Sequence, residues 1–174
     1  MNKNLVAVKE LRTKTSASIS DCKKALEDSA GNIDKAIELL RKRGLEIASK
    51  KQDRVTREGR VEAYVHLGNK IGVLLEVSCE TDFVARNEDF IKFTKDVAMQ
   101  IAACNPAYIK KEDVPKDVLK QESKPDEFLK SSCLLEQPFI KDASMTINDY
   151  LGSLIGKIGE NIIIRRFIRY KVGE

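Results

Sequence analysis

The sequence predicts an α+β protein in which a three-helix N-terminal module precedes an antiparallel three-stranded sheet backed by helices. Apolar residues recur at helical spacing in residues 4–43 and then alternate with polar residues from Gly59 onward. Residues 162–170 are rich in β-branched and aromatic side chains, which is typical of a strand. These observations divide the chain into a module (1–44), a charged linker (45–58) and an α+β core (59–174).

Three short helices are predicted within the module. Ser20 is expected to cap the second helix, and Gly31 to occupy the C′ position after it. Asn32 is expected to cap the third helix, which Gly44 would end. The predicted apolar faces comprise Leu5, Val8, Leu11, Cys22, Ala25, Leu26, Ile33, Ala36, Ile37 and Leu40.

A β-hairpin is predicted next, with its turn at Gly68 and Asn69. Alternation places Val61, Ala63, Val65 and Leu67 on one face of the first strand, and Arg60, Glu62, Tyr64 and His66 on the other. We expect the apolar face to be the buried one.

The rest of the core is predicted from caps and apolar stripes. Thr81 is expected to cap a short helix and Asn87 a longer one, whose face is Phe90, Phe93, Val97, Ile101 and Cys104. Short helices and loops are expected in residues 107–137. Thr146 and Asp149 resemble a capping box before a helix that Gly159 ends. Strand 162–170 is expected to be covered on both faces or paired across an interface.

Composition favours a soluble globular protein. Apolar residues make up 42% of the chain, and no apolar run approaches the roughly 20 residues that span a bilayer. No signal-peptide core is seen, so the protein is expected to act where it is made, without membrane contact. The net charge of +4 arises from a basic N-terminal third. Such a region could face an acidic protein surface or nucleic acid.

The residues that catalysis or metal binding would require are missing. The four cysteines form no CxxC pair, and His66 is the single histidine. We therefore expect buried, reduced thiols and neither a metal site nor a cofactor. No phosphate-binding glycine loop precedes a helix, and no histidine-centred catalytic set can be assembled. An enzyme is the least favoured class.

Two segments are candidates for binding. Residues 81–87 place an acid and an aromatic residue at the start of a helix that directly follows a buried strand. Residues 156–159 match the G-x-x-G loop of KH domains, which would make the chain an RNA-binding protein together with its basic N-terminal region. A third possibility is a scaffold that binds through the three-helix module alone.

Several blocks in one order resemble the elongation factor Ts family. They are VKELR at residues 8–12, DCKKAL at 21–26, CETDFVARN at 79–87, LLEQPF at 134–139 and KIGENI at 157–162. The resemblance covers nearly the whole chain apart from 107–133. It implies a ubiquitin-associated-like N-terminal module and a nucleotide-exchange activity toward the GTPase elongation factor Tu, in a bacterial cytoplasm or an organelle.

The resemblance also implies which residues act. Thr81, Asp82, Phe83 and Val84 would intrude beside the magnesium site of the GTPase and dislodge the ion, so that GDP leaves. Arg12, Ile19, Ser20 and Lys23 would dock on its GTPase domain, with Ile19 and Ser20 standing where many relatives have two methionines.

Two departures from the family pattern are visible. Longer members carry two related core halves, and this chain carries one; the resemblance therefore implies a homodimer. The segment 107–133 is shorter than in relatives. No direct contact with nucleic acid is implied.

Overall fold

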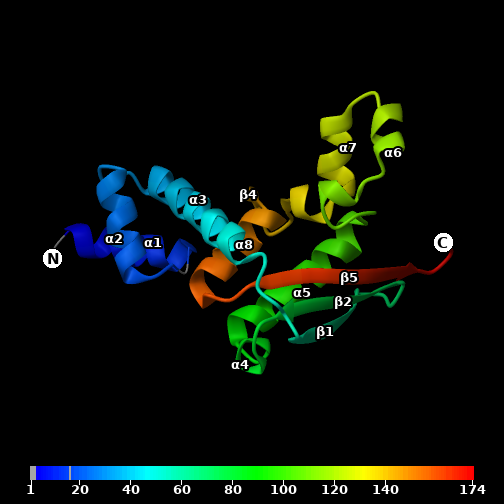
Figure 1. Ribbon diagram of the computed structural model, residues 1–174, viewed down its shortest axis with the longest axis horizontal. Coiled ribbons are helices and arrows are strands. Elements are labelled where there is room, and N and C mark those ends of the chain that lie inside the picture. Colours follow the sequence, from blue (N-terminus) through cyan, green and yellow to red (C-terminus); the bar gives the residue numbers. More distant parts are fainter. Residues whose placement is uncertain (1–2, 16) are drawn as a thin grey trace. The chain divides into compact units, whose positions relative to one another are not determined.

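The computed structural model describes residues 3–15 and 17–174, and Figure 1 labels its elements. The elements are α1 (Lys3–Thr15), α2 (Ile19–Asp28), α3 (Ile33–Lys51), β1 (Glu58–Val65), β2 (Ile71–Cys79), α4 (Asp82–Ala85), α5 (Glu88–Cys104), η1 (Lys111–Asp113), α6 (Lys116–Gln121), α7 (Pro125–Ser132), η2 (Leu134–Glu136), β3 (Pro138–Phe139), β4 (Asp142–Thr146), α8 (Ile147–Ile158) and β5 (Ile162–Lys171). They form two compact units: a helical unit, Met1–Arg54 with Leu151–Asn161, and a core unit, Val55–Tyr150 with Ile162–Glu174.

The helical unit begins with the three predicted helices, which share one small apolar core. Its buried residues are Val8, Leu11, Cys22, Ala25, Leu26 and Ala36. Ile33, Ile37 and Leu40 of α3 pack against this core, as the helical spacing predicts. Leu5, predicted on the same face of α1, is exposed instead, and Ala7 packs against the core.

The caps of α2 differ from the prediction by one or two residues. Ser18, rather than Ser20, is the N-cap, and its hydroxyl accepts a hydrogen bond from the Asp21 amide. At the other end, Ala30 takes the left-handed C′ conformation and Gly31 follows it. The Gly31 amide donates to Leu26 O and the Ala30 amide to Glu27 O, which is the Schellman pattern. Asn32 caps α3 as predicted, accepting from the Lys35 amide.

Helix α3 does not end at Gly44, as the sequence predicted, but continues to Lys51. Gly44 is buried within the helical unit, and a Cβ atom there would lie 2.9 Å from the carbonyl oxygen of Gly152 in α8. The glycine therefore permits close contact between two helices, which spacing within one helix does not reveal. Much of the predicted linker, 45–58, is helical as a result.

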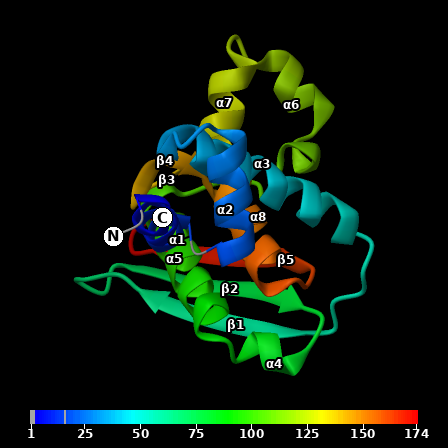
Figure 2. The same ribbon diagram turned by 90° about the vertical axis from the view of Figure 1, so that its left-hand side faces the viewer.

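The core unit is built on a three-stranded antiparallel sheet in the order β1–β2–β5, which Figure 2 shows with the strands side by side. Helix α5 packs on one face of this sheet (Figure 1). Phe90, Phe93, Val97 and Ile101 of α5 are fully buried, as predicted, together with Leu75 and Val77 of β2. Cys104 was expected on the same stripe, but it is exposed because α5 ends there.

The prediction of which face of β1 is buried was wrong. Val61 and Val65 are exposed, as is Leu67 beyond the strand, whereas Glu62 is buried. Its carboxylate accepts from Arg60 Nε at 2.8 Å and from Thr94 Oγ1 at 3.2 Å, so its burial is compensated. Alternation determines which residues share a face, but the position of α5 decides which face is covered.

Strand β5 is neither covered on both faces nor internal to the sheet. It is an edge strand, and a bulge interrupts its pairing with β2 at Glu76 and Val77. Ile162 and Ile164 are buried before the bulge, whereas Ile168 and Tyr170 are exposed after it.

The remaining elements agree with the short helices and caps that were predicted. Residues 107–134 form a separate excursion closed at its base, where Tyr108 and Cys133 form a β-bridge. Thr146 and Asp149 form the capping box of α8 through hydrogen bonds of 2.9 and 3.1 Å. Gly159, with φ of +84°, follows the end of α8. Among the described residues, no helix is long and apolar enough to cross a bilayer.

Candidate functional site

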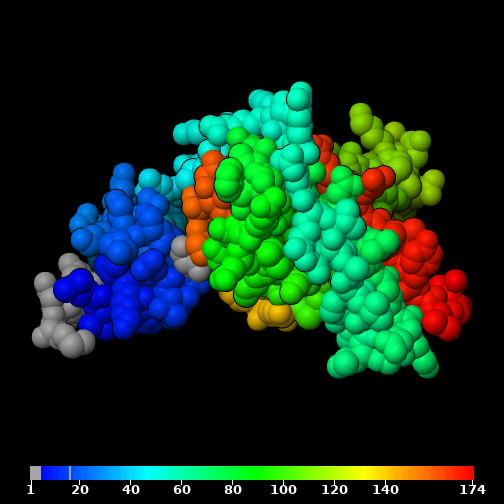
Figure 3. Space-filling view, turned by 90° about the horizontal axis from the view of Figure 1, so that it is seen from below, coloured from blue at the N-terminus to red at the C-terminus, as the bar shows by residue number. Residues whose placement is uncertain are grey.

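The candidate site is the connection between β2 and α5, where the predicted residues 81–84 lie; we call these residues the tip. β2 ends at Cys79, and the four-residue helix α4 begins three positions later, at Asp82. In the space-filling view of Figure 3, α4 and the neighbouring part of α5 (green) lie on the outer surface of the core unit. A buried strand thus leads directly to an exposed helical turn.

Local hydrogen bonds order the tip from both sides. Thr81 is the N-cap of α4, and its hydroxyl accepts from the Val84 amide at 3.5 Å. The buried thiol of Cys79 donates to the Thr81 carbonyl at 3.1 Å. Asn87 caps α5 and also donates its amide to Val84 O at 3.0 Å. Arg86, the C-cap of α4, and Asn87, the N-cap of α5, are the two residues between the helices, so the tip is capped at both ends.

The side chains of the tip are divided between solvent and core. Phe83 is 81% exposed, whereas Val84 is 8% exposed. Asp82 forms an ion pair with Arg86, 3.1 Å between Oδ2 and Nη2, on the outside of the turn. The tip therefore presents an aromatic ring and a carboxylate outward, while Val84 fixes the turn to the core unit. Val84 was predicted among the acting residues, but its side chain faces its own domain.

The predicted docking residues belong to the other unit. Arg12 is exposed near the end of α1, and Ile19, Ser20 and Lys23 are exposed on the first turns of α2. Ile19 is an apolar side chain at 51% exposure beside the cationic Lys23. The predicted residues thus fall in two places, the tip in the core unit and the docking residues on α1 and α2 of the helical unit.

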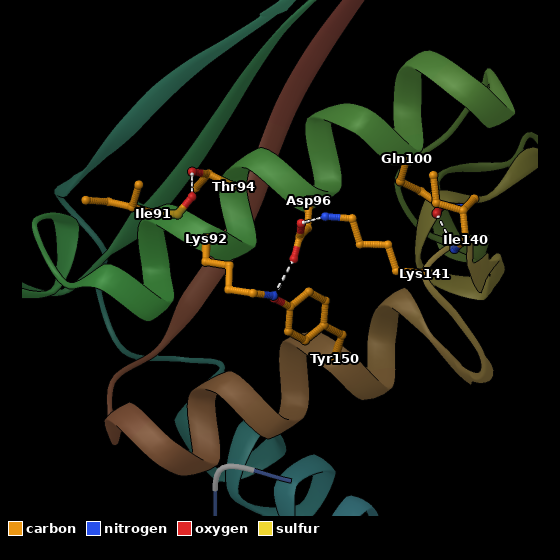
Figure 4. Close-up of polar contacts among 8 residues, drawn as sticks. All are labelled: Ile91, Lys92, Thr94, Asp96, Gln100, Ile140, Lys141 and Tyr150. Atoms are coloured by element: carbon orange, nitrogen blue, oxygen red, sulfur yellow. Dashed lines mark hydrogen bonds and ion pairs between the residues drawn. The ribbon is translucent and has the colours of Figure 1, made fainter. Parts of the chain in front are cut away.

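A cluster of charges around the buried carboxylate of Asp96 in the core unit was not found from the sequence. Asp96 of α5 binds Lys141 Nζ at 2.6 Å, Lys92 Nζ at 2.8 Å and the Tyr150 hydroxyl at 3.0 Å (Figure 4). The Tyr150 ring stacks on Phe139 and meets Phe93 edge-on. The i,i+4 spacing of Lys92 and Asp96 was visible in the sequence, but the two distant partners were not.

The protonation equilibria of this cluster argue for a structural role. Burial acts to raise the pKa of Asp96, but the hydrogen bonds from Lys141, Lys92 and Tyr150 outweigh it and lower that pKa below its ordinary value. Burial and the adjacent Asp96 carboxylate raise the pKa of Tyr150 well above its ordinary value. Both shifts move the groups away from neutral pH, where a general acid or base must exchange protons.

A second buried polar group joins α5 to residues 137–140. Gln100, fully buried, donates Nε2 to Gln137 Oε1 and to Pro138 O, and its Oε1 accepts the Ile140 amide at 2.9 Å. Figure 4 shows the contact with Ile140. These bonds hold the chain that leaves the excursion 107–134. The signal for this group in the sequence was Gln100, a polar residue among the apolar residues that form the buried face of α5.

The described residues contain no group of three or more histidine, cysteine, aspartate or glutamate side chains placed to hold a metal ion. The four cysteines, Cys22, Cys79, Cys104 and Cys133, form no disulfide. Burial raises the pKa of Cys22 and Cys133, which keeps these thiols protonated at neutral pH. The groups that the tip presents to solvent are the Phe83 ring and the Asp82 carboxylate.

Comparison with known proteins gives the same assignment over most of the chain. Residues 2–126 match the sequence profile of the family described as "Elongation factor TS". The chain is 49% identical to elongation factor Ts of Carboxydothermus hydrogenoformans over 190 positions, covering 96% of this chain and 88% of the relative. It is 50% identical to elongation factor Ts of Methylacidiphilum infernorum over 188 positions, covering 96% and 94%. Both alignments are longer than the chain itself, so these relatives carry residues without a counterpart here.

Proposed function

Because the chain belongs to the elongation factor Ts family, we propose that it is the guanine nucleotide exchange factor for elongation factor Tu and promotes GDP release in translation elongation. The observation that carries this proposal is the Phe83 ring, exposed on a capped turn whose neighbour Val84 is buried. A side chain that displaces groups of a partner must stand on an ordered backbone, because a flexible segment would move aside on contact.

In the proposed mechanism the tip enters beside the magnesium site of the GTPase. Mg²⁺ requires nearly ideal octahedral geometry and relies on few protein ligands together with phosphate oxygens. The Phe83 ring displaces the loop that supports these ligands, and the Asp82 carboxylate adds negative charge near the phosphates. Thr81 and Val84 act within the factor, by capping the turn and fixing it. Loss of the ion then weakens GDP binding.

The docking residues supply the second contact of the proposal. Arg12, Ile19, Ser20 and Lys23 are exposed, and they combine an apolar side chain with two cationic ones. We propose that they dock on an acidic part of the GTPase domain, which the basic N-terminal region would attract over a distance. Raising the ionic strength should slow association; a rate that does not depend on salt would contradict this.

Exchange of this kind makes and breaks no covalent bond. The coupling between the two ligands of the GTPase is reciprocal. If the factor lowers the affinity of the GTPase for GDP by some ratio, GDP lowers the affinity of the GTPase for the factor by the same ratio. Stopped-flow release of fluorescent GDP from elongation factor Tu tests the function directly. Release should accelerate with the concentration of this chain and then saturate. Equal rates with and without the chain would refute the exchange function.

The open face of the sheet supports a homodimer. This face, opposite α5, carries exposed apolar residues on all three strands: Val61, Val65, Leu74, Ile168 and Tyr170. Leu74 pairs with Ala63 on one side and with Ile168 on the other, so the apolar side chains are contiguous. Contiguous apolar surface of this kind marks an interaction surface on a soluble protein.

We propose a second copy of the chain as the occupant of this face. The chain has one core half where longer relatives have two, and two identical faces can pack as a sandwich with a two-fold axis. The expected structure is a dimer that supplies the second half in trans. Sedimentation equilibrium measures this state, and a chain that stays monomeric at micromolar concentration would contradict it.

The RNA-binding alternative is not favoured. In a KH domain the G-x-x-G loop joins two helices, whereas residues 156–159 lie at the end of α8 and lead into strand β5. We therefore propose neither direct nucleic-acid contact nor membrane contact. Since the relatives are bacterial elongation factors, we propose that the protein acts in a bacterial cytoplasm. RNA retention at physiological salt without a protein partner would speak against this assignment.

A further inference from the structure

The β-bulge in β5 changes the direction in which Arg165 can reach. Ile164 pairs with Val77 and Arg166 pairs with Glu76, which leaves Arg165 as the additional residue between them. A bulge turns the side chain of its extra residue away from the regular alternation of the strand. Here it directs Arg165 toward Ser78 of β2 and toward Thr56, which precedes β1.

The guanidinium of Arg165 binds three oxygen atoms. Its Nη2 donates to Thr56 Oγ1 at 2.6 Å and to Thr56 O at 3.3 Å, and its Nε donates to Ser78 Oγ at 3.3 Å. Thr56 and Ser78 are both buried. A planar guanidinium can bridge several acceptors at once, which a lysine ammonium at this position could not do with the same geometry.

Thr56 belongs to the connecting segment, residues 55–57, between α3 and β1. This segment forms neither helix nor strand, so no ladder of backbone bonds fixes it. It also begins at one of the three places where the chain passes between the two units. Arg165 therefore attaches the first residues of the core unit to its sheet.

A second residue closes the same connection from the helical unit. Asn161, nearly fully buried, donates Nδ2 to Arg54 O at 2.8 Å and to Gln52 O at 3.2 Å, beyond the end of α3. The chain returns to the core unit directly after Asn161. Asn161 in the helical unit and Arg165 in the core unit thus hold the chain at Gln52, Arg54 and Thr56.

We propose that Arg165 is a positioning residue for nucleotide exchange, because it holds Thr56 on the sheet and so fixes one of the three connections between the two units. This inference rests on the proposed function, in which the docking residues and the tip engage one GTPase molecule. Two linked contacts assist each other through their effective concentration, which falls when the tether between them becomes longer and looser.

The test compares Arg165→Ala and Thr56→Val with the wild-type chain in GDP release from elongation factor Tu. The concentration of factor that gives half-maximal release should rise about threefold to tenfold, while the maximal rate stays within about twofold. The double variant should show no further loss beyond Arg165→Ala, because that change already removes the contact with the Thr56 hydroxyl that Thr56→Val removes. Trypsin should cleave faster after Arg57 in all three variants, and this readout needs no partner.

Two further variants distinguish the bridge from charge alone. Arg165→Lys keeps the positive charge but cannot bridge the same acceptors, so its half-maximal concentration should still rise. A half-maximal concentration equal to that of the wild type would show that charge suffices and would contradict the bridging role. Lys70→Ala removes a charge from the exposed hairpin turn and should leave both readouts unchanged. Thermal unfolding followed by circular dichroism verifies that each variant is folded.

An unchanged half-maximal concentration in Arg165→Ala would overturn the proposal, as would a reduced maximal rate at unchanged half-maximal concentration, which would place the effect at the tip. If the wild-type chain does not accelerate release, the exchange function fails and the positioning role fails with it. Trypsin would still report whether Arg165 holds the connecting segment, so the two failures can be told apart.

Discussion

The side chains of Phe83 and Val84 lie on opposite sides of one helical turn, the ring in solvent and the isopropyl group in the core unit. The backbone between them is held by the cap at Thr81 and by the Asn87 amide. The ring is 81% exposed, so it contributes little to packing within its own domain. It is therefore the residue for which function and stability should separate most clearly.

Replacing Phe83 with Ala should reduce stimulated GDP release by about tenfold or more, since aromatic anchors dominate the energy of protein contacts. The melting temperature should not change, because the ring packs against little of its own domain. Val84→Ala is the matched control, because it removes buried methyl groups and should cost about 1–2 kcal/mol of folding free energy. Stopped-flow release and thermal unfolding of both variants decide the matter. Full stimulation by Phe83→Ala would refute the role of the ring.

Leu74→Lys should convert the proposed dimer into a monomer. It places a charge at the centre of the open sheet face, where the wild-type side chain is already half exposed, so the monomer should remain folded. Ile140→Lys is the control, because Ile140 is similarly exposed but lies on the turn between β3 and β4. Sedimentation velocity at matched concentrations distinguishes the two. If Leu74→Lys sediments like the wild type, the sheet face is not the dimer contact.

The Asp96 cluster should make folding stability depend on pH at the acidic end. The pKa of Asp96 is lowered in the folded protein from an ordinary value of 3.8, so the folded state binds the proton less readily than the unfolded state. The resulting stabilisation is present above about pH 4 and is lost as pH falls through the lowered pKa.

Asp96→Asn should therefore cost about 1–3 kcal/mol at neutral pH, because two lysines and Tyr150 lose their charged acceptor. The difference from the wild type should shrink as the pH is lowered below 4, in urea titrations at a series of pH values. Glu38→Gln, an exposed carboxylate of α3, serves as the control and should leave stability nearly unchanged. A difference between wild type and Asp96→Asn that stays constant down to pH 2 would contradict the assignment.

Gly44→Ala should destabilise the helical unit although alanine favours helices. The new Cβ would lie 2.9 Å from the Gly152 carbonyl oxygen, so the two helices must separate, at a cost of about 1–3 kcal/mol. Gly156→Ala is the matched case, since its nearest neighbour would be Gly44 Cα at 3.4 Å. That variant should be neutral, or more stable by up to about 1 kcal/mol. Equal melting temperatures for the two variants would show that the helices adjust freely.

Local signals in the sequence determined most elements of the chain. Asn32, Asn87 and Thr81 were identified as caps because capping is a bond between residues three positions apart or fewer. The tip was noted as a candidate because its acid and aromatic residue directly follow a strand and a cap, whereas the roles predicted for its residues were implied by the family resemblance. The similarity of long motifs in one order then indicated the family.

Tertiary packing decided what local patterns leave open. Alternation in β1 separated Val61 from Glu62, but only the position of α5 determined that Glu62 would be buried and Val61 exposed. Gly44 resembled a helix end, and only its contact with Gly152 showed a glycine required inside a helix. Asp96 with Lys141, and Arg165 with Thr56, are contacts between residues far apart in the chain. Such contacts depend on how elements pack, and the spacing of residues within one element carries no information about them.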